Sequence, residues 1–240
     1  MTEGHPARSA IAVVAVVVSA AAVALLLAAG PGTRLGLWTF GTGFQMLRFA
    51  VYGGAAGAVL ALVALVAGGR RGLAALGLVL GLAAAAVPWQ LQRSARSKPP
   101  IHDISTDTDN PPPFVAVAPL RRGASNPMEY GGPEIAAQQR KAYPDIAPAA
   151  VPLPPAQAFE RALRAARALG FEIVAAEPAE GRIEATDTTR WFGFKDDVVI
   201  RIRPDGAGSR VDVRSVSRVG RGDVGANARR IRSFLGALRG

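Results

Sequence analysis

One stretch of 21 residues without a charged side chain, Ser9 to Ala29, constrains this chain more than any other sequence feature. A helix rises about 1.5 Å per residue, so a stretch of this length can cross the roughly 30 Å hydrocarbon core of a membrane. Arg8 precedes it, as a cation precedes the apolar part of a signal peptide. The apolar part is too long for that class of segment, so we predict a transmembrane helix at about 9–29.

Two more apolar segments predict further membrane helices at about 49–67 and 72–87. Only about four residues join these two segments, so they should form an antiparallel hairpin. We therefore expect a membrane domain over residues 1–92 and a polar linker over 93–100. Glycines spaced four apart on the hairpin either allow close helix contact or merely pad the helices: Gly53 with Gly57, and Gly77 with Gly81.

Charge is divided unevenly along the chain. Only Glu3 is acidic before residue 100, and the net charge is +6 over residues 1–97 and +4 over the remainder. Most of the excess is arginine beside apolar segments, where cations contact lipid head groups, and no nucleic-acid-binding motif accompanies it. We expect the lipid bilayer as a partner and no nucleic acid. Three Arg residues flank the predicted helices on the side of the membrane that holds the N-terminus, and five Arg and Lys residues flank them on the side that holds the soluble part. Because flanking cations are more frequent on the cytoplasmic side, this count favours a cytoplasmic soluble domain.

The chain lacks cysteine and has only His5 and His102 as histidines. Disulfides, thiolate chemistry and a multi-histidine metal centre are therefore excluded, and we expect no metal and no cofactor.

Residues 101–240 predict a soluble α+β domain with an antiparallel β-meander and helices packed on one face. The apolar periodicity of 154–169 indicates an amphipathic helix, and Asp223 is placed to cap a final helix. A shorter helix is predicted at 133–143. The predicted strands are 101–104, 114–120, 171–176, 182–188, 197–203 and 210–217.

The last two strands predict a hairpin through Pro204-Asp-Gly-Ala-Gly208. Their alternation places Arg201 opposite Asp212 and Arg203 opposite Arg210 on the face away from the core. We expect that ladder to be solvated, with the opposite-charge pair contributing toward the lower end of about 0.2–1 kcal/mol.

Alternating oxygen side chains in residues 103–109 begin like a calcium loop, and Asp107 and Asp109 belong to this pattern. The pattern fails where Thr108 replaces the required glycine and Phe114 the bidentate glutamate, so a structural turn is the preferred interpretation.

Three other segments hold candidate site residues. Tyr143 either lines a site or covers the core. Asp196 and Asp197 are adjacent on a strand, so their side chains should face opposite ways rather than form a catalytic pair. The remaining candidates are an aromatic loop between strands and two arginines before the final helix: Trp191, Phe192, Phe194, Arg218 and Arg221. The loop either closes the core or contacts a membrane or apolar ligand, and the arginines either hold an anion or form salt bridges with the turn.

Four motifs in this order are similar to the bacterial and plastid family called domain of unknown function 1499. They are Asp103-Ile-Ser-Thr-Asp-Thr-Asp-Asn-Pro-Pro, Gln139-Arg-Lys-Ala-Tyr-Pro-Asp, Trp191-Phe-Gly-Phe-Lys-Asp-Asp and Asp212-Val-Arg-Ser-Val-Ser-Arg-Val-Gly. The resemblance covers about residues 98–240. It implies a cell-envelope domain carried behind an export or membrane signal, and hence an extracytoplasmic location. It implies no activity, substrate or catalytic residue.

Together these features predict a multi-pass inner-membrane protein that presents a non-enzymatic binding or scaffold domain at the membrane surface. Its partner would be an envelope protein or a lipid ligand. The alternative is an envelope hydrolase or transferase that uses Asp107, Asp109, Asp196 or Asp197 as acid or base.

Overall fold

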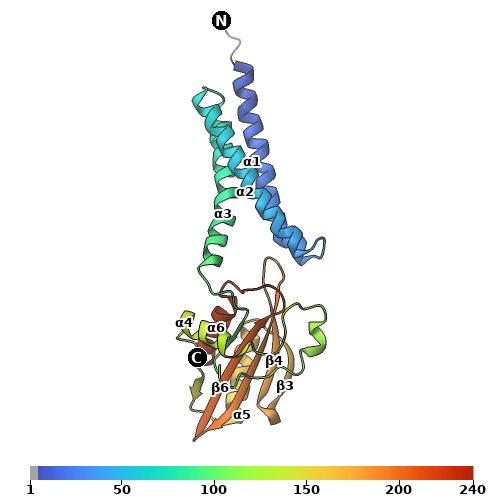
Figure 1. The fold of residues 1–240 in the computed structure, drawn as a ribbon, viewed down its shortest axis with the longest axis vertical. Coiled ribbons are helices and arrows are strands. Elements are labelled where there is room, and N and C mark those ends of the chain that lie inside the picture. The colour runs from blue at the N-terminus through green and yellow to red at the C-terminus, as the bar shows by residue number, and fades with distance from the viewer. Residues whose placement is uncertain (1–4, 240) are drawn as a thin grey trace. The chain divides into compact units, whose positions relative to one another are not determined.

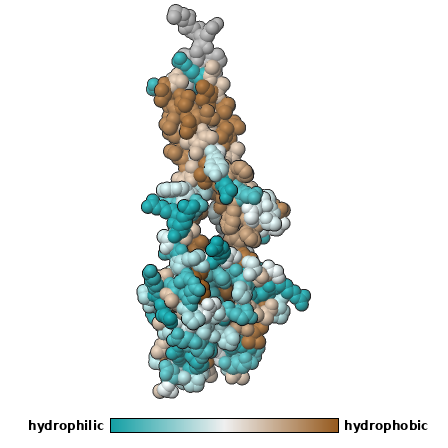
Figure 2. Space-filling model, viewed as in Figure 1, coloured by the Kyte–Doolittle hydropathy of each residue, from teal (hydrophilic) through white to brown (hydrophobic). Residues whose placement is uncertain are grey.

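The computed structural model describes residues 5–239, and the chain divides into two compact units (Figure 1). The first unit comprises residues 1–94 with the loop 190–193, and the second comprises 95–189 with 194–240. The order of the elements confirms the predicted fold class, three long apolar helices followed by an α+β part. Figure 2 shows hydrophobic residues concentrated on the helical part and hydrophilic residues on the surface of the α+β part.

Three helices form the first unit: α1 (His5–Arg34), α2 (Phe40–Val66) and α3 (Arg71–Arg96). Each is long and apolar enough to cross a membrane. Helix α2 begins at Phe40, not near residue 49, because the hydroxyl of Thr39 accepts a hydrogen bond from the Thr42 amide at 3.3 Å.

Helix α3 also differs from the prediction. It continues through Pro88 to Arg96, so the first half of the expected linker at 93–100 is helical. Proline is tolerated in membrane helices where neighbouring groups form hydrogen bonds with the backbone groups that proline leaves without a partner.

Small residues bring α2 and α3 together. A Cβ atom added to Gly54 would lie 2.6 Å from the Gly81 carbonyl oxygen, and one added to Gly81 would lie 2.6 Å from the Gly54 oxygen. The Ser19 hydroxyl of α1 donates a hydrogen bond to the Gly77 carbonyl at 2.8 Å. Glycine at these positions therefore permits backbone contact rather than padding the helices.

The second unit contains an antiparallel sheet of six strands. Four of them, β3 (Glu172–Glu177), β4 (Arg182–Thr188), β5 (Lys195–Asp205) and β6 (Gly208–Ser217), form the predicted meander. Strands β1 (Asp103–Ser105) and β2 (Ala149–Val151) both pair with β6. Strand β2 was not predicted, because its three residues are too few for a periodic signal.

Helices cover one face of this sheet, as predicted. Helices α5 (Pro155–Ala168) and α6 (Ala226–Arg239) pack there, and α4 (Gly132–Ala142) lies before β2 in the chain. The shared core is apolar and buried; its members include Phe159, Leu163, Ile183, Val198, Ile200, Val213, Ile231 and Phe234. Asp223 lies three residues before α6 and caps it as expected, since its carboxylate accepts hydrogen bonds from the Asn227 and Gly225 amides at 2.6 and 2.9 Å.

The predicted strand at 114–120 is wrong. Residues 106–131, here called the covering segment, are irregular apart from a 3₁₀ helix, η1 (Ala118–Arg121). The segment contributes Phe114 and Val117 to a second apolar cluster with Val199 and Val216. These two valines alternate with the core residues of their strands, so the covering segment lies on the sheet face opposite α5 and α6.

We expect residues 98–240 to fold without the membrane helices, because the second unit has its own apolar core. Expressed alone, this fragment should give a cooperative thermal unfolding transition in circular dichroism. A gradual, non-cooperative loss of signal under all buffer conditions would contradict the prediction.

Candidate functional site

The sheet face under the covering segment, here called the charged face, gathers half of the charged residues of the sequence motifs. Alternation along β4, β5 and β6 points Glu184, Asp197 and Asp212 toward this face, and all three side chains are 0% exposed. Burying an ionised carboxylate is costly unless it is paired and hydrogen-bonded. The partners of each carboxylate therefore decide what this face can do.

Asp212 lies in a cluster of three arginines. Its carboxylate accepts hydrogen bonds from Arg201, Arg203 and Arg210, each at 2.9 Å. The carboxylate of Asp107 in the covering segment accepts from Arg201 and Arg210, both at 3.1 Å. Asp107 therefore ties the covering segment to the sheet and does not project into a cleft.

The β5–β6 register confirms the predicted pairs, with Arg201 opposite Asp212 and Arg203 opposite Arg210. The prediction that this ladder is solvated is wrong for Asp212, which is fully buried, whereas the side chains of Arg203 and Arg210 are each 39% exposed. The cross-strand repulsion between Arg203 and Arg210 is offset because both guanidiniums donate to Asp212.

Arg214 forms a second buried pair. Its Nε and Nη2 atoms donate to the two carboxylate oxygens of Asp103 at 3.0 and 2.7 Å. The guanidinium also donates to the carbonyls of Pro112 and Met128 in the covering segment. It lies 5.0 Å from the ring centre of Phe114 and 5.5 Å from that of Tyr130, within the range of cation–π attraction.

Glu184 explains why the covering segment is not a strand at this point. Its carboxylate accepts hydrogen bonds from three successive amides, those of Val115, Ala116 and Val117, at 3.0 to 3.1 Å. It is also paired with Arg182. Amides that bind one carboxylate cannot also form a strand ladder, so the chain turns here into η1.

Asp197 is bound from three sides. It accepts hydrogen bonds from Arg218 at 2.8 Å, from the Thr186 hydroxyl at 2.8 Å and from Arg121 of the covering segment at 2.6 Å. Burial alone would raise the pKa of Asp197, but these hydrogen bonds and the charge of Arg218 outweigh it and lower the pKa below the usual 3.8. A carboxyl group held ionised in this way is a poor proton donor.

The lowered pKa of Asp197 predicts the pH dependence of one variant. Because the folded-state pKa lies below that of the unfolded chain, the stability contributed by Asp197 is present above about pH 4 and lost as pH falls through the folded pKa. The difference in unfolding free energy between wild type and Asp197→Asn should therefore be constant near neutral pH and shrink in acid. Urea unfolding of both proteins across this range measures it, and a difference that grew on acidification would contradict the assignment.

Asp196 faces the opposite side of the sheet, as its adjacency to Asp197 predicted. It accepts a hydrogen bond from Arg230 of α6 at 2.6 Å. Arg230 also donates to Asp187 at 2.7 Å. Asp196 therefore holds Arg230 on one face, Asp197 holds Arg121 and Arg218 on the other, and the two carboxylates do not share a site.

The other predicted site residues do not join the charged face. The side chain of Asp109 is 91% exposed and lies 3.4 Å from Arg140. Tyr143 is buried in the helix-side core with its ring 5.5 Å from the Arg232 guanidinium, and burial raises its pKa. Arg221 is exposed in the loop before α6. The candidates within the second unit therefore do not converge on one cleft.

The aromatic loop is a closed turn. The Thr189 amide donates to the Phe194 carbonyl and the Phe194 amide donates to the Thr189 hydroxyl, both at 2.8 Å. Gly193 has a φ of 70°, which favours glycine. The ring centres of Trp191 and Phe192 are 5.4 Å apart in an edge-on arrangement. All three aromatic side chains are half-buried.

Sequence reasoning did not single out two residues that complete the charged face, Arg121 and Glu184. Strand alternation could have indicated that Glu184 shares a face with Thr186. The partners in the covering segment lie far away in the sequence, so no local pattern marks them.

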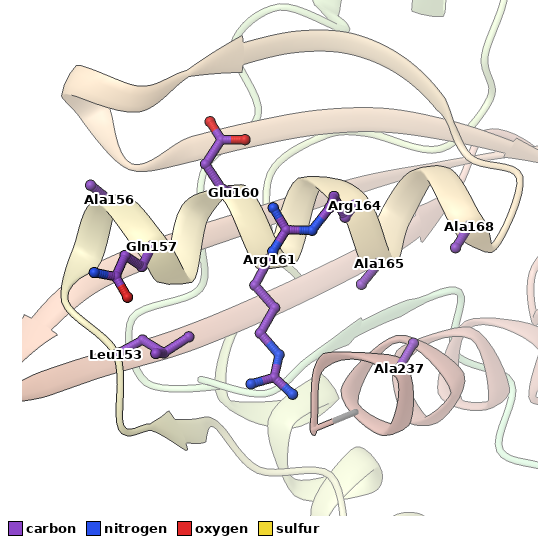
Figure 3. Close-up of a pocket in the computed structure, with 9 residues that line it drawn as sticks. All are labelled: Leu153, Ala156, Gln157, Glu160, Arg161, Arg164, Ala165, Ala168 and Ala237. Carbon is purple, nitrogen blue, oxygen red and sulfur yellow. The ribbon is translucent and has the colours of Figure 1, made fainter.

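An open groove lies on the other side of the domain, between α5 and α6 (Figure 3). It has a volume of about 800 Å³ and is shallow. Alanines from both helices form much of its lining, and Arg161 projects from α5 into it. Unlike the charged face, the groove is accessible to a partner.

These observations define a class: a membrane protein with three candidate spans and an α+β domain whose sheet carries buried ion pairs beneath a covering segment. The chain belongs to the family of proteins of unknown function designated DUF1499, whose match extends over residues 103–238, more than half of its length. The predicted family resemblance is thereby confirmed. No protein of curated function and no solved structure is detectably similar to this chain.

Proposed function

We propose that this protein is a membrane-anchored, non-enzymatic module whose soluble domain binds a partner or serves as a scaffold at the membrane surface. The observation that supports this proposal is that most carboxylates of the sequence motifs are buried and paired with arginines. Asp103, Asp107, Asp197 and Asp212 all receive hydrogen bonds from arginine and lie at least largely buried. Such groups hold a fold together and are poorly suited to proton transfer.

The enzyme alternative has less support in the same geometry. Of its four candidate residues, Asp107, Asp196 and Asp197 are held by arginines. Asp109 is the accessible one, and its nearest charged partner is Arg140 at 3.4 Å. A carboxylate exposed on a turn lacks the enclosed surroundings that tune a catalytic pKa.

A photo-crosslinking scan of the full chain in cells tests the proposal. A photoreactive amino acid is placed at exposed positions spread over the soluble domain, and adducts are identified by mass spectrometry. We expect a specific adduct from one contiguous surface that persists in the Asp109→Asn variant. Absence of adducts at every position, together with turnover of isolated envelope material by wild type but not by Asp109→Asn, would instead support an envelope hydrolase or transferase.

We further propose that the soluble domain lies outside the cytoplasm, with the protein in the inner membrane. The resemblance to an envelope family supports this side, whereas the count of flanking cations favours the other. A reporter that is active only in the cytoplasm, fused after residue 240, should stay silent, and one that requires export should be active. The reverse pattern would place the domain in the cytoplasm.

A further inference from the structure

We propose that the groove between α5 and α6 binds an acidic amphipathic helix of a partner protein. The inference rests on the proposed binding function and names the surface and the kind of partner. It starts from the groove in Figure 3, which is lined mainly by α5, with Leu153 before this helix and Ala237 of α6.

The shape of the groove favours a helix over a small molecule. Sites for small ligands enclose most of the ligand surface, whereas this groove is open along its length. Its lining includes Ala156, Ala165 and Ala168 of α5 and Ala237 of α6. Side chains this small let the backbone of a docked helix come close, as in other complexes where a helix lies in a groove.

The charge of the groove indicates what the partner carries. Arg161 is half-buried and Arg164 is exposed, and within residues 5–239 neither guanidinium has a carboxylate partner. This differs from the charged face, where Arg121, Arg214 and Arg218 are all paired. Glu160 also lines the groove, but Figure 3 shows its side chain pointing away from that of Arg161. Two accessible cations against one carboxylate leave the lining net positive, which complements a helix with apolar side chains on one face and carboxylates along its flank.

The same charges argue against a second copy of this chain as the occupant. Helix α5 carries three arginines and one glutamate, so two such helices brought together would repel. Anionic lipid is a different class of partner, and the experiment separates it from the peptide.

The test uses the full chain in micelles of an uncharged detergent. The probe is a fluorescent helical peptide with alanine and leucine on one face and glutamate along its flanks. Binding is measured by anisotropy. We expect the peptide to bind wild type and the Arg161→Glu/Arg164→Glu variant to bind about tenfold more weakly or worse. The matched control is Arg122→Glu/Arg221→Glu, which makes the same charge change at exposed positions outside the groove and should leave the affinity unchanged.

Three outcomes would overturn the proposal: no binding of the acidic peptide, equal loss of binding in the control variant, or equal binding of a peptide with lysine in place of glutamate. Binding of phosphatidylglycerol vesicles in place of the peptide, sensitive to Arg161→Glu/Arg164→Glu, would also overturn it and identify a lipid surface. Thermal unfolding of each variant verifies that it is folded, and Arg161→Gln/Arg164→Gln provides a milder second variant.

Crosslinking in cells separates this proposal from the general one. A photoreactive residue at Ala168 or Ala237 should give an adduct that disappears in the Arg161→Glu/Arg164→Glu background. Adducts confined to other surfaces would leave the binding function intact and reject the groove. Absence of adducts everywhere would reject both.

Discussion

Replacing Glu184 by glutamine is expected to destabilise the soluble domain by about 3–5 kcal/mol, because it breaks a buried ion pair and leaves one partner charged. The carboxylate is fully buried and receives Arg182 and the amides of Val115, Ala116 and Val117. The NH₂ group of a glutamine side chain is a hydrogen-bond donor and would face backbone N–H groups that are also donors. Arg182 would in addition lose its buried counter-charge.

Glu180 provides a matched control for this variant. It pairs with the same guanidinium, that of Arg182, at 2.9 Å, but its side chain is 61% exposed. Solvent screens such a pair, so Glu180→Gln should cost less than about 1 kcal/mol. Urea unfolding of residues 98–240, followed by circular dichroism, measures both. Equal losses for the two variants would show that the Glu184 carboxylate does not hold the covering segment.

Replacing Arg214 by methionine is the second change with a large expected effect. It removes both hydrogen bonds to Asp103, whose side chain is only 5% exposed, and leaves that carboxylate without its arginine. The carbonyls of Pro112 and Met128 also lose a donor. The free energy of unfolding should fall by about 3–5 kcal/mol, because one member of a buried ion pair is left without its partner.

The double variant Asp103→Leu/Arg214→Met distinguishes pairing from simple packing. Removing both charges avoids the stranded carboxylate, so the double variant should be more stable than Arg214→Met alone. Arg214→Lys keeps the positive charge but cannot bind both carboxylate oxygens in the same plane. Its stability should therefore lie between that of Arg214→Met and that of the double variant. If the double variant were the least stable, the loss would come from packing of the arginine stem and not from the ion pair.

The meander and its register were predictable because local patterns determine them. Strand alternation around the Pro204–Gly208 turn fixes Arg201 opposite Asp212. The apolar stripe of α5 and the capping position of Asp223 are also local features. All of these follow from residues close together in the sequence.

The charged face was not predictable, because its partners are distant in the sequence. The alternating apolar residues of 114–120 suggest a strand, yet Glu184, almost seventy residues away, binds the amides there. Nothing in the composition of the covering segment indicates that it shields Asp212. A carboxylate of a motif is therefore easily taken for a solvated or catalytic group until its arginine partners are located.

Hydrogen exchange at the amides of Val115, Ala116 and Val117 tests most directly whether the motif carboxylates are structural. If Glu184 holds these amides permanently, they should exchange about as slowly as the amides at the centre of β5, near the rate set by global unfolding of the domain. Rapid exchange at the three amides while β5 stays protected would contradict this. It would mean that the covering segment opens in the native state and gives substrates access to the carboxylates beneath it.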